Sequence, residues 1–269
     1  MVSKYKRKKI GLFKFPKKDS KGVITGEYWA EKLASMLADR INLPCQSVEI
    51  GKYKGRIGSM NYYFLENSET LVEGINFITK IFIDYDENKF YDTVLDRHYD
   101  IQMIVEAINV VGLSTEILEI IIFDILIGNS DRHHSNWGVV FNEIERTIKI
   151  APVYDNSSSL CCYNNEEDIE DILRDKCRYQ AMLTTKSKAL VGWKNKRKMQ
   201  HFELLIMLNL EYCHEVKGII SRIKENLNEE VIKELVYEFD EDTISSKRKK
   251  LLIKFLVDRR EKIIGKEFD

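Results

Sequence analysis

An Asp, an Arg, two His and two Asn stand within eight residues, directly after the most apolar segment of the chain. The stretch "LIGNSDRHHSNWGVVF" (126–141) separates Asp131 from Asn136 by four residues, and Asp155 follows in "APVYDNSS". One carboxylate can take the proton of an attacking hydroxyl, while an amide oxygen and a second carboxylate can hold the Mg²⁺ ions that bridge nucleotide phosphates. These residue types in this order predict phosphoryl transfer, with Asp131 as catalytic base and Asn136 and Asp155 as metal ligands.

The flanking sequence indicates how these residues are positioned. Residues 114–127 predict a buried helix that ends at Gly128, and 137–155 predict a hairpin that folds Asp155 back toward Asn136. Taken alone, Asp-x-x-x-x-Asn is a common spacing, so the alternative interpretation is an ordinary polar loop. The combination of loop, preceding helix, hairpin and final Asp favours a catalytic loop over that alternative.

The two histidines of the loop offer a rival, a metal site built from His98, Asp131, His133 and His134. Adjacent histidines on a loop rarely point at one metal ion, so we do not favour this site. We interpret His133 as part of the nucleotide site, where it supports the loop by hydrogen bonding to the backbone or the Asp. We expect His134 to be exposed.

A phosphoryl-transfer site also needs a cation over the phosphates and an acid to hold it. In "LFKFP" (12–16), Lys14 lies on an alternating strand between two Phe residues. The next helix carries Glu27 on its inner stripe, and we predict a Lys14–Glu27 pair, with Glu31 as the alternative partner. No glycine-rich phosphate loop precedes Lys14 in this sequence.

Composition and charge indicate the class of protein and its kinds of partner. The chain has 269 residues, 44% hydrophobic and 32% charged, with a formal net charge of -1, so charge does not indicate a nucleic-acid or membrane partner. The basic N-terminus and the basic stretch 186–198, which we expect to be an exposed loop, are the only features that suggest nucleic acid. Five cysteines without metal-like spacing and no signal peptide predict a reduced, cytoplasmic protein.

Alternation predicts a strand at 10–15, followed by a helix within 26–44 and two or three strands within 45–65. Helical periodicity dominates the rest of the chain outside the hairpin. These patterns predict an α+β fold with a small mixed lobe at 1–66 and a larger helical lobe at 67–269. The larger lobe would contain the catalytic loop (128–138) and the metal-binding segment (150–160). The helical stretches are 69–80, 96–111, 114–127, 201–226, 228–239 and 244–264.

The pieces "LFKFP", "GEYWAEKLASMLADRINLP", "MNYYFLENSETLVEGINFI", "ILIGNSDRHHSNWGVVF" and "IAPVYDNSSSL" together resemble the HipA-like serine/threonine kinases, within them the shorter, stand-alone branch. The catalytic-loop segment is also similar to that of phosphoinositide kinases. The resemblance implies a bilobal protein-kinase-like fold that binds ATP and Mg²⁺ in its cleft. It further implies that the backbone of Tyr63, Phe64, Leu65 and Glu66 holds adenine, and that Ser157, Ser158 and Ser159 begin an activation segment open to phosphorylation, unless they form only a flexible polar loop.

The resulting expectation is an ATP- and Mg²⁺-dependent protein serine/threonine kinase that acts on a protein hydroxyl and could also phosphorylate itself. Two alternatives stay open: a phosphoinositide-like or small-molecule kinase with the same site, and a nucleotide-binding pseudokinase that acts as an interaction module. A regulatory partner chain is a further open alternative. We expect neither nucleic acid nor a membrane as a partner.

Overall fold

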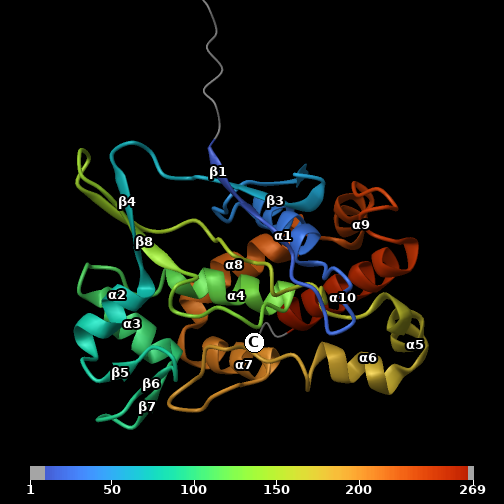
Figure 1. Ribbon diagram of the computed structural model, residues 1–269. Helices are drawn as coiled ribbons and strands as arrows, with labels where there is room; N and C mark the ends of the chain where they lie inside the picture. Colours follow the sequence, from blue (N-terminus) through green and yellow to red (C-terminus); the bar gives the residue numbers. More distant parts are fainter. Residues whose placement is uncertain (1–9, 266–269) are drawn as a thin grey trace, which may run out of the picture.

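The computed structural model describes residues 10–265, so the basic N-terminal stretch noted above lies outside the described residues. A three-stranded antiparallel sheet opens the fold, with strand order β1-β3-β2 (Figure 1). Helix α1 (Glu27–Arg40) packs on this sheet through its Leu and Ala stripe. The predicted strand at 10–15, the helix within 26–44 and the following strands are thereby confirmed. The strands are β1 (Gly11–Lys14), β2 (Val48–Tyr53) and β3 (Arg56–Tyr62).

A second antiparallel sheet contains the predicted hairpin. Strands β8 (Gly138–Asn142) and β9 (Thr147–Ile150) form the hairpin, and β4 (Glu69–Glu73) joins its other edge. The helix predicted over 69–80 is therefore wrong for its first half, because that segment pairs with β8 along its length. Helix α2 (Gly74–Ile81) begins only where this pairing ends.

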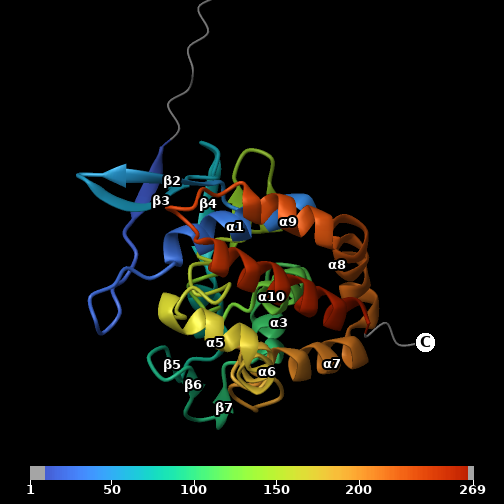
Figure 2. The same ribbon diagram turned by 90° about the vertical axis from the view of Figure 1, so that its right-hand side faces the viewer.

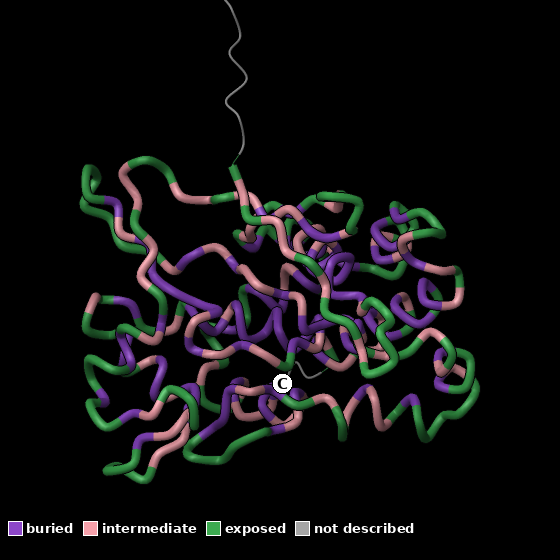
Figure 3. The backbone as a smooth tube through the Cα atoms, viewed as in Figure 1, coloured by how far each residue is buried: buried purple, intermediate pink, exposed green. Residues whose placement is uncertain are grey.

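Helix α4 (Ile117–Ile127) lies at the centre of the molecule, and its apolar side chains are almost all fully buried (Figure 3). Gly128 ends the helix with φ of 68°, a left-handed conformation that glycine adopts at little cost. The long helix α10 (Ser246–Ile264) packs across α4 (Figure 1). Its Arg259 donates hydrogen bonds to the carbonyls of Ile125 and Leu126. The end of α4 that leads into residues 129–136 is therefore held in place by α10.

Further helices surround α4, and a small sheet of β5, β6 and β7 lies beside α3 (Figure 1). The predicted helix 201–226 is two helices divided at Tyr212, and two short helices after residue 168 were not predicted. Among the described residues, no helix is both long and apolar enough to cross a membrane. The remaining bounds are β5 (Tyr85–Asp86), β6 (Tyr91–Asp92), β7 (Arg97–His98), α3 (Ile101–Asn109), the 3₁₀ turn η1 (Glu166–Asp168), α5 (Ile169–Arg174), α6 (Lys176–Leu183), α7 (His201–Glu211), α8 (Cys213–Asn226) and α9 (Glu229–Tyr237).

The segment 186–198 is not the exposed loop that its basic composition suggested. Ala189, Val191 and Trp193 are buried, while the lysines on either side of this stretch face solvent. Gly192 exchanges backbone hydrogen bonds with the chain at the start of α3, including one from its N–H to the Tyr99 carbonyl. Apolar residues between the charges thus tie this segment to the core.

Candidate functional site

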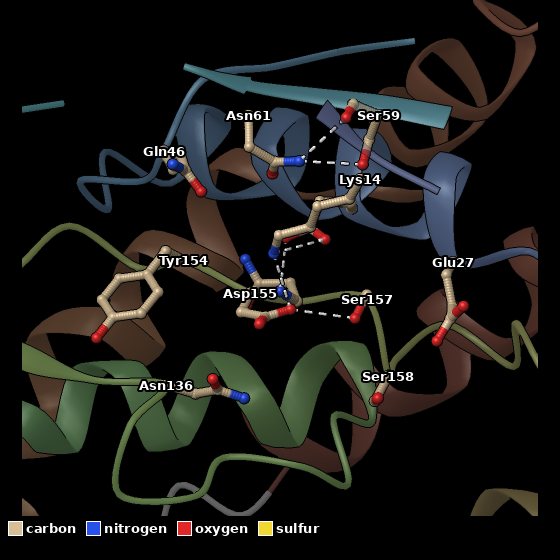
Figure 4. Close-up of polar contacts among 12 residues, drawn as sticks. Lys14, Glu27, Gln46, Ser59, Asn61, Asn136, Tyr154, Asp155, Ser157 and Ser158 are labelled. Carbon is tan, nitrogen blue, oxygen red and sulfur yellow. Dashed lines mark hydrogen bonds and ion pairs between the residues drawn. The ribbon is translucent and has the colours of Figure 1, made fainter. Parts of the chain in front are cut away.

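Lys14 reaches from the end of β1 into the candidate site. Its Nζ lies 3.1 Å from Asp155 Oδ1 and 3.7 Å from Glu31 Oε2 (Figure 4). Lys14 pairs in register with Ser59 of β3, so both residues face the same side of the sheet. Three segments that are far apart in the sequence therefore meet at the Lys14 ammonium.

The predicted Lys14–Glu27 pair is wrong, because the acid of α1 that contacts Lys14 is the alternative, Glu31. Glu27 is buried one helical turn earlier and accepts hydrogen bonds from Lys17 N (2.5 Å), Thr25 Oγ1 (3.0 Å) and Tyr163 OH (2.9 Å). The turn after β1 folds back over the start of α1, and its own backbone and side chains satisfy Glu27. Glu27 still lines the same cavity as Lys14.

The two carboxylates that face Lys14 differ in their electrostatics. Burial raises the pKa of the Glu31 carboxyl above its ordinary value, although the Lys14 ammonium acts in the opposite direction. Burial also acts to raise the pKa of Asp155, but the Lys14 ammonium and the Ser157 hydroxyl outweigh it, and this pKa lies below its ordinary value. Asp155 is thus the acid that is held ionised and available to a cation.

The backbone on both sides of Asp155 is fixed by charged side chains. Asp155 has a φ of 53°, in the left-handed region that few residues other than Gly, Asn and Asp adopt. The carbonyl of Tyr154 accepts a hydrogen bond from Arg132 Nη1 (2.7 Å), and the N–H of Asn156 donates to Glu31 Oε1 (2.9 Å). These two bonds hold the strained residue so that its carboxylate points toward Lys14.

Arg132, which directly follows the candidate base Asp131, connects several parts of the site through its hydrogen bonds. Its guanidinium is 2% exposed and donates from Nε and Nη2 to the carboxylate of Asp124 on α4 (2.8 and 2.7 Å). Its other bonds reach the Asn136 carbonyl (2.6 Å) and Asn156 Oδ1 (2.7 Å), besides the Tyr154 carbonyl. One side chain therefore joins the central helix, the loop of residues 129–136 and the segment around Asp155.

Asp131 and Asn136 lie on the loop that Arg132 holds. The N–H of Asp131 donates to Asn129 Oδ1 (3.0 Å), and Asn136 Nδ2 donates to the Asp131 carbonyl (2.8 Å), which leaves the Asn136 amide oxygen to face away from the loop backbone. His133 supports the loop, since its Nδ1 accepts from Ser135 N (3.2 Å) and its N–H donates to the Asp131 carbonyl. These contacts agree with the expected hydrogen bonding of His133 to the loop backbone, and its place in a nucleotide site stays a prediction.

A cavity of about 470 Å³ brings these residues together. Lys14, Glu31, Asp131, His133 and Asp155 line it, whereas Asn136 is buried and does not. Asn136 comes from the same loop, on the side of Asp155 away from Lys14 (Figure 4). A basic group, a carboxylate fit to bind a cation and a second carboxylate thus line one cavity.

His134 corrects another expectation, because it is buried rather than exposed. Its Nδ1 shares a hydrogen bond with Tyr85 OH (3.1 Å), and its ring packs against Phe90 and Tyr99. Burial lowers the pKa of this imidazole to about 4. In residues 10–265 no three His, Cys, Asp or Glu side chains are grouped closely enough to hold a metal ion, so the rival histidine metal site is excluded there.

The four residues proposed to hold adenine connect β3 to β4. Tyr63 is exposed, and its N–H donates to the Ile10 carbonyl (2.9 Å). Phe64 is half-buried and stacks on Tyr154, the neighbour of Asp155, with 5.9 Å between ring centroids. Leu65 is half-buried and Glu66 is exposed. The aromatic stack places this connection beside the Asp155 segment, and the adenine contact itself stays a prediction.

The three serines after Asp155 form an ordered turn. Ser157 Oγ donates to Asp155 Oδ1 (3.1 Å), Ser158 Oγ shares a hydrogen bond with Tyr163 OH (2.9 Å), and Ser159 Oγ donates to the Asn156 carbonyl (2.6 Å). Ser158 and Ser159 are buried. Their side chains therefore stabilise the turn, which argues against the flexible loop considered above.

Sequence reasoning missed the residues that position the site, Asp124, Asn129, Arg132 and Asn156. A signal was present for one of them, since Asp124 interrupts an apolar helix and a buried carboxylate requires a cationic or hydrogen-bonding partner. Asn129 Nδ2 also donates to Asp124 (2.9 Å). Nothing in the local sequence indicates that Asn156 lies against Arg132.

Comparison with known proteins defines the class. A model of the HipA-like C-terminal domain family matches residues 5–240, so the chain belongs to this family. The chain is 23% identical over 271 residues to the serine/threonine-protein kinase CtkA of Helicobacter pylori, covering 98% of this chain and 80% of CtkA.

Solved structures show the same fold. The crystal structure of the H. pylori proinflammatory kinase CtkA superposes with a TM-score of 0.79 at 20% identity, covering 96% of this chain and 86% of the other. HipA from the Shewanella oneidensis complex of HipA, HipB and operator DNA gives a TM-score of 0.56 at 12% identity. That match covers 88% of this chain but only 56% of the other. The fold of the chain is thus similar to that of kinases of this family.

Proposed function

We propose that this chain is an ATP- and Mg²⁺-dependent protein serine/threonine kinase of HipA-like type. The observation that carries the proposal is the meeting of Lys14, Asp131 and Asp155 in one cavity, with Lys14 Nζ 3.1 Å from Asp155 Oδ1. Membership in the HipA-like family and the similarity to CtkA support it. The acceptor would be a protein hydroxyl in the cytoplasm, in keeping with five cysteines that are all free thiols.

In the proposed reaction the acceptor oxygen forms a bond to the γ-phosphorus of ATP. The bond from that phosphorus to the β–γ bridging oxygen breaks, and ADP leaves with the electron pair. Asp131 takes the proton that the acceptor hydroxyl releases. Lys14 stabilises negative charge on the phosphates, and Arg132 keeps the loop of Asp131 fixed against the segment of Asp155.

The side chains at the site suit Mg²⁺, which prefers hard oxygen donors. Asp155 is held ionised. Its ion pair with Lys14 and its hydrogen bond from Ser157 both involve Oδ1. The Asn136 amide is oriented by the bond from its nitrogen to Asp131. We therefore propose Asn136 and Asp155 as the residues that hold Mg²⁺, whose charge would neutralise the phosphates of bound ATP.

Two alternatives remain distinguishable by experiment. A pseudokinase is favoured by the sequence before Lys14, which contains no glycine-rich phosphate loop. It would bind nucleotide without transferring phosphate. A phosphoinositide-like or small-molecule kinase would transfer phosphate from ATP but not to protein.

The test is transfer from radiolabelled Mg²⁺-ATP to the chain itself and to myelin basic protein, followed by mass spectrometry. Asp131→Asn and Asp155→Asn keep side-chain volume, and each should lower transfer at least about 100-fold, the usual effect of losing a general base or a metal-bound transition-state contact. Asp242→Asn, at an exposed site distant in sequence, is the matched control and should keep full transfer.

A fully active Asp155→Asn protein would contradict the site assignment. Tight binding of ATP without transfer to any acceptor would favour the pseudokinase. Transfer to a lipid or a small metabolite, with none to protein, would favour the other enzyme class.

A further inference from the structure

A second cavity, of about 210 Å³, adjoins the candidate active site. Its lining residues come from the turn that joins β1 to α1, the start of α1, the segment 162–167 and the start of α10. The ribbon of these segments can be followed in Figure 2. Tyr28 and Trp29 are buried at its base, whereas Val23 (58% exposed), Ile24 (48%) and Tyr163 (47%) lie at the surface around it. We call these five residues the aromatic pocket. Three large apolar side chains exposed around one hollow are unusual on a surface without a binding role.

The charged groups around the aromatic pocket are paired with one another. Arg248 lies 2.9 Å from Glu166, and its remaining nitrogens donate to backbone carbonyls. Lys21 lies 3.2 Å from Glu167, and the Asp19 carboxylate accepts from two backbone N–H groups of its own turn. No single sign of charge dominates, so the pocket offers no unpaired charge to a charged side chain, whereas the five residues named above offer apolar surface. The remaining polar groups of the lining are uncharged, and they are Thr25, Asn164, Asn165, Thr243 and Ser245.

The aromatic pocket and the active-site cavity share a wall one residue thick. Tyr28 lines both spaces, and Glu27 faces the active site while Gly26, its neighbour, faces the pocket. Hydrogen bonds from Thr25 and Tyr163 to the Glu27 carboxylate hold this wall in place. An extended peptide advances roughly 3.3–3.6 Å per residue, so two to four residues span roughly 7–14 Å, enough to cross a wall of this thickness.

We propose that the aromatic pocket binds an apolar side chain, aromatic or leucine-like, of a polypeptide acceptor whose hydroxyl enters the active-site cavity. This inference rests on the proposed kinase function and adds its substrate class. The volume of about 210 Å³ is sufficient, since a closed apolar cavity of roughly 150 Å³ holds benzene. A polypeptide meets both requirements, because its backbone links a hydroxyl to an apolar group over this short distance.

The experiment uses the full chain and a peptide library in which one Ser is fixed and each neighbouring position carries Phe, Leu, Gly, Lys or Glu in turn. We expect Phe or Leu to be favoured at one position, two to four residues from the Ser, by about 10-fold or more in kcat/KM over Gly. Ile24→Ser should reduce that preference several-fold while the KM for ATP and the rate with Gly peptides stay unchanged. Ile83→Ser, at an 86% exposed site elsewhere, is the control and should change nothing.

Peptide phosphorylation without a preference at these positions would overturn the inference, as would a preference that survives Ile24→Ser. Phosphorylation of lipids or small metabolites, with no peptide accepted, would also overturn it and leave phosphoryl transfer intact. Failure to transfer phosphate to any acceptor, including the chain itself, would instead contradict the proposed function on which it rests.

Discussion

Removal of Arg132 should separate folding stability from phosphoryl transfer in this chain. Asp124 on α4 is 3% exposed, and Arg132→Met leaves its carboxylate with one side-chain hydrogen-bond donor, the Asn129 amide. Breaking a buried ion pair by removing one member typically costs about 3–5 kcal/mol, because the other charge stays buried without compensation. We expect Arg132→Met to lower the free energy of unfolding by about that amount.

The double variant Asp124→Leu/Arg132→Met removes both charges and fills much of their space with apolar atoms. We expect its loss of stability to be smaller than the sum of the two single losses by at least about 2 kcal/mol. Phosphoryl transfer should nevertheless stay abolished, because Asn136, Tyr154 and Asn156 no longer share a donor. Partial recovery of stability without recovery of transfer would assign Arg132 a positioning role.

Urea denaturation followed by circular dichroism gives the stabilities, and the radiolabel assay gives transfer. Arg222→Met is the matched control. Arg222 on α8 lies 2.7 Å from Glu119, which is on α4 like Asp124, yet the two side chains are 29% and 33% exposed. This pair should contribute no more than about 1 kcal/mol. Single losses that add within about 0.5 kcal/mol, or an Arg132→Met protein as stable as the control, would refute the reasoning.

Two further predictions concern pH. Burial raises the pKa of Glu31 in the folded state. Such an acid lowers the stability of the fold as pH rises from the pKa of the unfolded state, near 4.3, through the pKa of the folded state. Glu31→Gln keeps an oxygen that can accept from Asn156 N–H, and its free energy of unfolding relative to the parent should therefore be higher at pH 7 than at pH 4. The KM for ATP should rise, because Lys14 loses a partner. A difference in unfolding free energy that is constant with pH would contradict this. Burial lowers the pKa of His134 to about 4, so the stability that its neutral form contributes is lost as pH falls from about 6.5 through 4. His134→Phe should lose less stability over that range in urea titrations, and an unchanged slope would exclude His134 as a source of acid sensitivity.

Part of the candidate site could be predicted from local sequence, because its chemistry depends on short-range order. Asp131 and Asn136 lie on one loop, and a hairpin with a polar turn returns the chain so that Asp155 follows β9. The family resemblance rested on these segments, and the family match confirms it. The division at residue 66 into two lobes stays a prediction.

Long-range contacts decided the remainder. Within 69–80 the apolar residues Leu71, Val72, Ile75, Phe77 and Ile78 have spacings that fit a helix, and only the pairing of β4 with β8 made residues 69–73 a strand. His134 was expected to be exposed because it stands in a polar loop, but Tyr85 and Phe90 from a distant segment cover it. Neither outcome is encoded in the residues next to it.

The choice between Glu27 and Glu31 shows what the sequence alone could not predict. Helical periodicity determined that both acids share the inner face of α1, since they are four residues apart. The packing of α1 on β2 and β3 and the fold of the turn between β1 and α1 then brought Glu31 to Lys14 and Glu27 to Tyr163. Sequence thus determined which groups could do the chemistry, whereas the tertiary structure determined which of them meet, because burial obliges each charge to find a partner that only packing brings within reach.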